Sequence, residues 1–374
     1  IAFALPFLIS KEITKLFRCL AGAYILIAFY DIVKSDAQQG LIISALSFGL
    51  VGFFLIRSRF TSRLINFGYL CAGTLFLIFG ILGTLQKGPL SSLLYKLSVT
   101  YRGDYWHAGL VMIKNNPLFG VGLDSYGDYY RATRSLAATL RRGPSTVSNA
   151  AHNVFVDIAA TSGIFALLAY LLIIFLGFRA AIKISKRDKS FNPFFISIIV
   201  TWVGYLVQSI ISINNIALGI WGWVLPGLLI SIEKWSNNSP YKPLKPKKSL
   251  EFGGMAMVIG LTIGAVIGFI PFNADANFRH SIESRNADLI YKAATKWPTD
   301  CARVLYAARI FDQNKIKDKA LSLARVAVKI NPRSFDAWMY LYQSPNTSGS
   351  EKREILDRLK TLDPHNPDLV KLNG

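Results

Sequence analysis

The sequence predicts an all-α protein in two parts: a polytopic membrane helix bundle with a long extracytoplasmic loop, then a small soluble domain of helical repeats. Three observations predict this fold. Hydrophobic residues make up 52% of the 374 residues and charged residues only 17%, whereas soluble domains carry about 25% charge. Apolar runs of spanning length recur over residues 1–272, and proline anchors recur at a regular interval over 273–374. We place the domain boundary between these two ranges.

The same composition excludes several classes of protein. The shortage of charge must lie in stretches that avoid water, which excludes a mostly soluble enzyme and a disordered chain. Three isolated cysteines, Cys19, Cys71 and Cys301, cannot form a CxxC metal site or a disulfide framework. The formal net charge of +20 is assigned first to cytoplasmic loops, as expected in a membrane protein.

Seven apolar runs approach the length of about 20 residues that a membrane helix needs. They lie at about 19–33, 40–56, 64–85, 153–178, 193–213, 216–232 and 254–271. The first ten residues, IAFALPFLIS, are apolar but too short to span. We interpret them as the end of a cut helix and expect further helices upstream.

Basic residues set the orientation of these spans. They cluster before the first span, between the second and third, after the fourth and after the sixth, at residues 11–18, 57–63, 179–189 and 234–248. All four clusters fall on one side if each span crosses once, and the positive-inside rule assigns that side to the cytoplasm. The loop 86–152 and the chain after about residue 272 are therefore predicted to be extracytoplasmic.

The tail carries proline anchors at Trp297-Pro298, Asn331-Pro332 and Asp363-Pro364, spaced by 34 and 32 residues. This interval is typical of tetratricopeptide-like helix pairs, which have a repeat of about 34 residues. An ordinary helical bundle is the alternative interpretation.

The outer loop 86–152 holds eight Lys and Arg against three Asp, a net charge of +5. The arginine fork matches phosphate oxygens, so Arg131, Arg134, Arg141 and Arg142 predict an anionic ligand. Solvated charges, or arginines facing lipid headgroups, are the alternative. Tyr126 and Tyr130 lie among these cations, an arrangement that suits sugars joined to phosphates, although tyrosines also populate membrane interfaces.

Residues 100–123 predict a helix followed by a tight turn. One stripe of the helix has a helical spacing and consists of Arg102, Trp106, Gly109 and Ile113. Asn116-Pro117 ends the helix, and Gly120 and Gly122 allow a tight backbone course. The glycines match neither a dinucleotide fingerprint nor a phosphate-binding loop.

His152 and Asn153 lie where the fourth span begins. A neutral imidazole there can accept a proton from a hydroxyl. No second His or Cys lies at ligand spacing, so a metal role is not expected. Asp157, four residues after Asn153, is predicted to orient the His-Asn pair, with plain packing as the alternative. His107 is a second candidate proton acceptor, and His280 and His365 are predicted to lie on the surface.

The motifs R-x-x-x-W-x-x-G-L-x-M-I at 102–113, N-P-L-F-G-V-G-L at 116–123 and H-N-x-F-x7-G at 152–163 resemble the O-antigen ligase and polymerase family of bacterial inner-membrane glycosyltransferases. The resemblance covers about residues 40–235. It implies transfer of a glycan from undecaprenyl diphosphate to an acceptor hydroxyl on the outer face of the inner membrane, with inversion at the sugar and without a cofactor or metal. Arg102, helped by Arg131 or Arg134, suits the leaving diphosphate, and His152 suits the hydroxyl proton.

A polysaccharide ligase, as in lipopolysaccharide assembly, is the leading hypothesis. A polysaccharide polymerase and a protein O-oligosaccharyltransferase share the donor and remain open, so the acceptor is a lipid, a glycan or a protein. The remaining predicted substrate contacts are Trp106 and Asn153, with membrane lipids as partners and no nucleic acid. A scaffold that displays the repeats is the non-enzyme alternative. A transporter is disfavoured because essentially only Asp157 is ionisable deep in a span.

Overall fold

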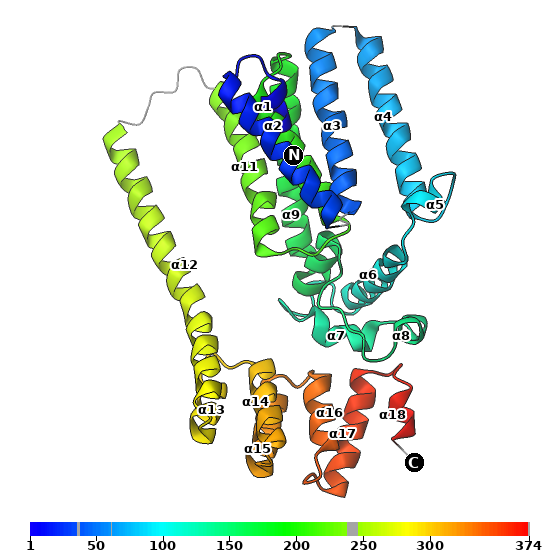
Figure 1. Ribbon diagram of the computed structural model, residues 1–374, viewed down its shortest axis with the longest axis vertical. Coiled ribbons are helices and arrows are strands. Elements are labelled where there is room, and N and C mark those ends of the chain that lie inside the picture. Colours follow the sequence, from blue (N-terminus) through cyan, green and yellow to red (C-terminus); the bar gives the residue numbers. More distant parts are fainter. Residues whose placement is uncertain (36–37, 61, 238–245, 373–374) are drawn as a thin grey trace. The chain divides into compact units, whose positions relative to one another are not determined.

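The computed structural model describes residues 1–35, 38–60, 62–237 and 246–372, and within these ranges every regular element is a helix. Figure 1 shows the helices in chain order. They form two compact units. Unit 1 comprises residues 1–138 and 148–240, and unit 2 comprises residues 139–147 and 241–374. The predicted all-α class is confirmed for the described residues.

Among the residues that the structure describes, six helices are long and apolar enough to cross a membrane. Five lie in unit 1: α2 (Lys15–Lys34), α3 (Gln38–Arg59), α4 (Arg63–Thr84), α9 (Val154–Arg187) and α11 (Ile216–Asn237). The sixth is α12 (Pro246–Glu283) of unit 2. These six match six of the seven predicted spans, and they indicate a multi-pass membrane protein.

The predicted span 193–213 differs from the structure. Helix α10 (Pro193–Ser209) has 17 residues and ends at Ile210, because the chain turns there toward the polar pair Asn214-Asn215. It is an apolar helix below spanning length. Its side chains are nevertheless the most buried in unit 1, with Val200 and Trp202 fully covered.

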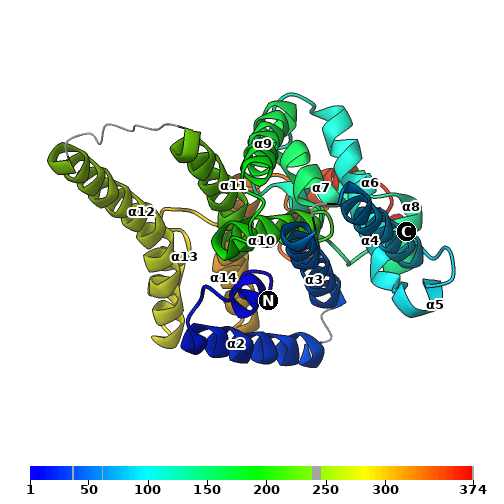
Figure 2. The ribbon, with the colours of Figure 1, turned by 90° about the horizontal axis from the view of Figure 1, so that it is seen from above.

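Helix α10 is the centre of unit 1, with α3, α9 and α11 around it (Figure 2). Leu229 of α11 and Val51 of α3 join the same apolar core. The short helix α1 (Leu5–Ile9) also packs on α10, where the Ser197 hydroxyl donates to the Phe3 carbonyl over 2.7 Å. The apolar start of the chain therefore belongs to the core of unit 1.

Basic residues from two of the four clusters, Arg57 and Lys183, lie at one end of unit 1. The terminal nitrogens of Arg57 donate to the hydroxyl and the carbonyl of Ser185 over 2.7 and 2.5 Å. Lys183 pairs with Glu233 over 3.0 Å. These contacts join the end of α3 to the ends of α9 and α11 (Figure 1). These basic residues lie on one side of unit 1, as the predicted topology requires. The assignment of that side to the cytoplasm stays a prediction.

The outer loop folds into four short helices between α4 and α9: α5 (Ser91–Leu94), α6 (Leu97–Asn115), α7 (Tyr126–Thr133) and α8 (Leu136–Arg142). Helix α6 ends at the cap residue Asn116, as the Asn-Pro signal predicts. The boundary between the units falls inside α8, so Arg141 and Arg142 belong to unit 2.

Unit 2 continues from α12 through six shorter helices. They are α13 (Ala287–Ala294), α14 (Cys301–Gln313), α15 (Lys317–Ile330), α16 (Phe335–Gln343), α17 (Gly349–Leu362) and α18 (Asp368–Lys371). Successive helices pack against each other around one apolar core. The three proline anchors follow α13, α15 and α17. The predicted boundary at residue 272 falls inside α12, and the tetratricopeptide assignment stays a prediction.

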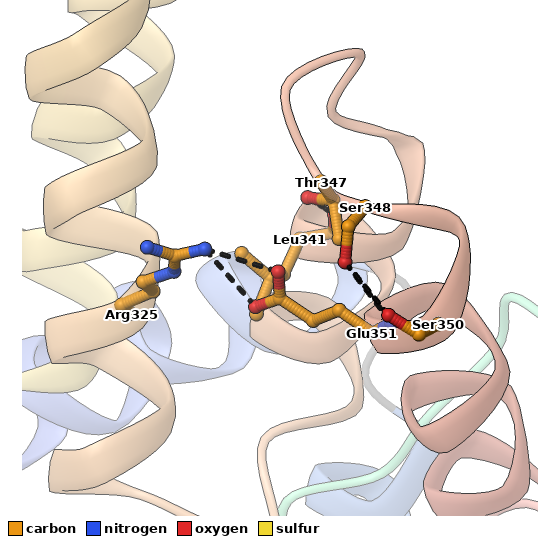
Figure 3. Close-up of polar contacts among 6 residues, drawn as sticks. All are labelled: Arg325, Leu341, Thr347, Ser348, Ser350 and Glu351. Atoms are coloured by element: carbon orange, nitrogen blue, oxygen red, sulfur yellow. Dashed lines mark hydrogen bonds and ion pairs between the residues drawn. The ribbon is translucent and has the colours of Figure 1, made fainter.

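Polar contacts link non-consecutive helices of unit 2. Nη2 of Arg325 on α15 lies 3.0 and 3.3 Å from the two carboxylate oxygens of Glu351 on α17 (Figure 3). The Ser348 hydroxyl caps α17 by accepting from the backbone N–H of Glu351, and the Thr347 hydroxyl donates to the carbonyl of Leu341. The turn between α16 and α17 is thereby fixed at both ends.

Arg303 is expected to dominate the local stability of unit 2. Its buried guanidinium donates to the carbonyls of Ala294, Lys296 and Pro298 in the turn after α13. Arg303→Ala leaves these acceptors unpaired, so we expect the free energy of unfolding to fall by about 2–4 kcal/mol. Thermal unfolding of the full chain measures the loss. Arg309→Ala, an exposed position on the same helix, is the control, and equal losses in both variants contradict the assignment.

Candidate active site

The three motif segments of the sequence meet in unit 1. Tyr105 and Met112 of α6, Tyr126 of α7, and Ala151 and Ala160 at the start of α9 form one small buried cluster. Helix α6 packs on both α7 and α9. The outer loop is therefore anchored to the membrane helix α9 by apolar contacts, and the candidate residues lie around this cluster.

Gly109 brings α6 close to α9. A Cβ at this position would lie 2.6 Å from Cγ1 of Val156 and 3.4 Å from the Tyr126 hydroxyl, so a side chain there requires its neighbours to move. The predicted stripe of α6 thus faces α9 at Gly109. Trp106 and Ile113, from the same stripe, pack at the edge of the buried cluster.

The second motif docks on a break in α9. Gly163 has φ 81° and ψ 179°, which interrupts the helix. The N–H groups of Val121 and Gly122 donate to the carbonyls of Ala160 and Thr161 over 2.8 and 3.0 Å. These backbone bonds satisfy acceptors that the broken helix leaves open.

A third backbone bond completes this junction, because the N–H of Ile164 donates to the Pro117 carbonyl over 2.9 Å. A Cβ on Gly163 would overlap the backbone of Leu118, and one on Gly120 would lie 2.6 Å from the Thr161 carbonyl oxygen. The sequence analysis predicted an uninterrupted span over 153–178 and missed this break. Its sequence signal is Thr161-Ser162-Gly163 inside the apolar run.

His152 has a constrained backbone. Its φ of 53° lies in the left-handed region, which costs energy for a residue with a Cβ. On one side the Ala151 N–H donates to Oδ1 of Asp157 over 2.9 Å. On the other side Oδ1 of Asn153 caps α9 by accepting from the N–H groups of Phe155 and Val156. Asp157 and Asn153 therefore fix the chain on both sides of the imidazole.

The His152 ring stacks on Tyr105, with centroids 4.9 Å apart and planes at 23°. Arg102 precedes Tyr105 by three residues on α6, so the two occupy neighbouring positions on the same side of the helix. The stack thus brings the third motif to the first. Arg102 therefore lies on the helix that His152 contacts, and the pairing of Arg102 with His152 stays a prediction.

Two buried donors of α6 have no acceptor among the residues that the structure describes. They are Nε of Arg102 and Nε1 of Trp106, one helical turn apart. Burial also lowers the pKa of the Arg102 guanidinium. Buried donors are nearly always paired, so this pair is suited to an acceptor-rich ligand such as a phosphate or a sugar.

Tyr126 and Tyr130 were predicted to contact the substrate, but their side chains are only 1% and 2% exposed. The Tyr126 hydroxyl donates to the Tyr105 carbonyl over 2.5 Å, and the two tyrosine rings stack with centroids 6.3 Å apart. In this structure both rings join α7 to α6 and present no open face to a sugar.

Arg131 and Arg134 are also buried, at 8% and 2% exposure. The solvated-charge alternative is therefore wrong for these two residues. The positive charge of Arg134 acts on Tyr130, which places it beside the buried tyrosines. Arg141 is exposed and Arg142 half-buried, both in unit 2. His107 is exposed on α6, and His280 and His365 are exposed as predicted.

Tyr130 gives the site a pH-dependent stability. The pKa of Tyr130 is raised from 10.0 to about 12, mainly by burial of its hydroxyl. The positive charge of Arg134 lowers this pKa, and the negative charge of Asp104 raises it. As the pH rises, the unfolded chain loses the Tyr130 proton before the folded chain does. We therefore expect the contribution of Tyr130 to the free energy of unfolding to be constant below pH 10 and to fall between pH 10 and 12. Unfolding of the purified chain against pH measures this fall, and Tyr130→Phe is expected to reduce it. An unchanged slope in that variant contradicts the assignment.

The fold and the site define a multi-pass helical membrane protein whose outer loop packs on the broken helix α9. Residues 23–171 match the family model described as O-antigen ligase. This range contains all three motif segments, and the match supports the O-antigen ligase family and a glycan-transferring membrane enzyme. No curated protein matches the sequence.

Proposed function

We propose that the protein is a membrane glycosyltransferase of the O-antigen ligase type. It transfers a glycan from undecaprenyl diphosphate to an acceptor hydroxyl at the outer face of the bacterial inner membrane. One observation carries the proposal: Arg102 and Trp106 have buried donors without an acceptor in the described part of the chain, and they lie on the helix whose Tyr105 stacks on His152. The family match to residues 23–171 supports the substrate class.

Arg102 meets the charge that develops on the leaving group. When the anomeric C–O bond to the diphosphate breaks, the electron pair stays on the phosphate oxygen, and undecaprenyl diphosphate leaves with additional negative charge. A preorganised guanidinium stabilises this charge most strongly where water is excluded. Arg131 and Arg134, buried in the same unit, add positive potential. The charge is thus met by side chains, and the proposal needs no metal.

His152 accepts the proton of the acceptor hydroxyl as its oxygen attacks the anomeric carbon. Attack from the ring face opposite the diphosphate forms the new C–O bond and inverts the sugar. The constrained backbone at 151–153 holds the imidazole in place, with Asp157 as a positioning residue through the Ala151 N–H. Trp106 supplies a donor and an aromatic face for the sugar.

The three acceptor classes differ in the product that they yield. A ligase joins the glycan to a lipid, a polymerase lengthens a lipid-linked chain, and a protein transferase modifies Ser or Thr. A ligase is the primary proposal because the matched family is described by that activity.

The test is a donor-consumption assay on the purified full chain in lipid nanodiscs. The donor is an undecaprenyl-diphosphate-linked glycan, offered with a lipid, a glycan or a protein acceptor. Release of undecaprenyl diphosphate with a new glycan–acceptor bond is the expected result. A folded protein that consumes no donor with any of the three acceptors supports the scaffold alternative instead.

A further inference from the structure

A polar cavity lies at the opposite end of α9 from His152. Its volume is about 210 Å³, and it lies where α3 and α9 end and α10 begins. Its cationic side chains are Arg57, Arg187 and Lys189. None of these residues belongs to the candidate active site, and the proposed reaction leaves the cavity without a role.

The cavity has an excess of positive charge. Asp188 is the acidic residue of its lining, and its Oδ1 accepts from the backbone N–H of Ser190 over 2.8 Å. Arg57 is half-buried, and its guanidinium donates to the neutral hydroxyl and carbonyl of Ser185. Within the described residues no carboxylate pairs with Arg57. A partly desolvated guanidinium with only neutral acceptors favours an anion beside it.

One part of the cavity wall is apolar, beside the polar Ser190 and Asn192. Phe54 and Phe195, whose rings contact edge-to-face at 5.9 Å, line it together with Ile232. The cavity therefore joins cations and hydroxyls to an apolar surface at the ends of membrane helices. That depth corresponds to lipid headgroups, where basic pockets between membrane helices recognise anionic lipids.

We propose that this cavity binds the phosphodiester headgroup of an anionic phospholipid. The phosphate oxygens accept from Arg57, from the Ser185 hydroxyl and from Lys189, and the acyl chains lie along Phe54 and Phe195. The lipid ties α3 to the α9–α10 turn at the end of unit 1 that carries the basic loops. The binding site is separate from the proposed glycan transfer and does not depend on it.

Native mass spectrometry of the detergent-purified full chain tests the proposal, with phosphatidylglycerol and phosphatidylcholine added in equal amounts. We expect selective retention of phosphatidylglycerol. Arg57→Gln and Lys189→Gln are each expected to weaken that retention about fivefold. Arg59→Gln removes an exposed charge from the same end of α3 outside the cavity and is the matched control.

Three results overturn the proposal. They are equal retention of both lipids, loss of retention in the Arg59 control to the same extent, and retention unchanged in both cavity variants. Inorganic phosphate distinguishes a free anion from a lipid. If phosphate alone binds with the same dependence on Arg57 and no lipid is selected, the lipid assignment is wrong. Lys189 is exposed, so its variant remains informative if Arg57→Gln disturbs folding.

Discussion

Replacing Arg102 with alanine, or His152 with asparagine, is expected to lower the rate of glycan transfer by about 10² to 10³. Arg102→Ala removes the guanidinium that meets the departing diphosphate. His152→Asn removes the proton acceptor while retaining a residue that tolerates the left-handed backbone at φ 53°. We expect both variants to lose transfer rate while they still insert into the membrane and fold.

The measurement is release of undecaprenyl diphosphate by each purified variant, with thermal unfolding recorded in parallel. Lys114→Ala, at the exposed end of α6, controls for loss of charge on that helix. His107→Ala, an exposed histidine of α6, tests the alternative proton acceptor. Near-normal transfer by Arg102→Ala or His152→Asn contradicts the role assigned to that residue, and a selective loss in His107→Ala moves the base to His107.

Gly163→Ala is expected to be the most destabilising single substitution at the junction with α9. Its φ of 81° and ψ of 179° lie in a region that only glycine adopts readily, at a cost of about 1–3 kcal/mol for other residues. The added Cβ also overlaps the backbone of Leu118, and overpacking costs about 1–3 kcal/mol more. We therefore expect a loss of about 2–6 kcal/mol and release of loop 116–123 from α9.

Chemical unfolding in detergent measures this loss, and proteolysis of loop 116–123 measures the release. Gly73→Ala is the matched control, because it is a glycine within a membrane helix with no atom within 4 Å of the new Cβ. We expect this control to unfold like the native chain. A Gly163→Ala variant as stable as Gly73→Ala shows that the break in α9 does not depend on glycine.

The sequence was sufficient to predict the features that depend on local chemistry. The apolar runs located six of the described helices, although α9 and α12 continue past the predicted runs to Arg187 and Glu283. Asn116-Pro117 gave the end of α6. Both follow from hydrophobicity and from the steric restriction before proline. Arg57 donates to Ser185, so two of the basic clusters lie together. This was predictable because alternate spans return the chain to the same side and the positive-inside rule places basic residues on that side.

Contacts between distant segments could not be predicted in this way. Tyr126 and Tyr130 are buried because α7 packs against α6. No local sequence pattern distinguishes a buried tyrosine from one at the membrane interface. The break at Gly163 is stabilised by backbone groups of a loop about 40 residues earlier in the chain. The burial of Arg131 and Arg134 could not be predicted for the same reason.

Backbone hydrogen bonds hold loop 116–123 on α9, while three of its apolar side chains stay exposed. Leu118, Phe119 and Leu123 are 51%, 79% and 82% exposed. Exposed apolar side chains on a loop that backbone bonds hold in place favour hydrocarbon over water. We therefore expect this loop to enter the membrane surface and to fix the depth of His152 relative to the lipid.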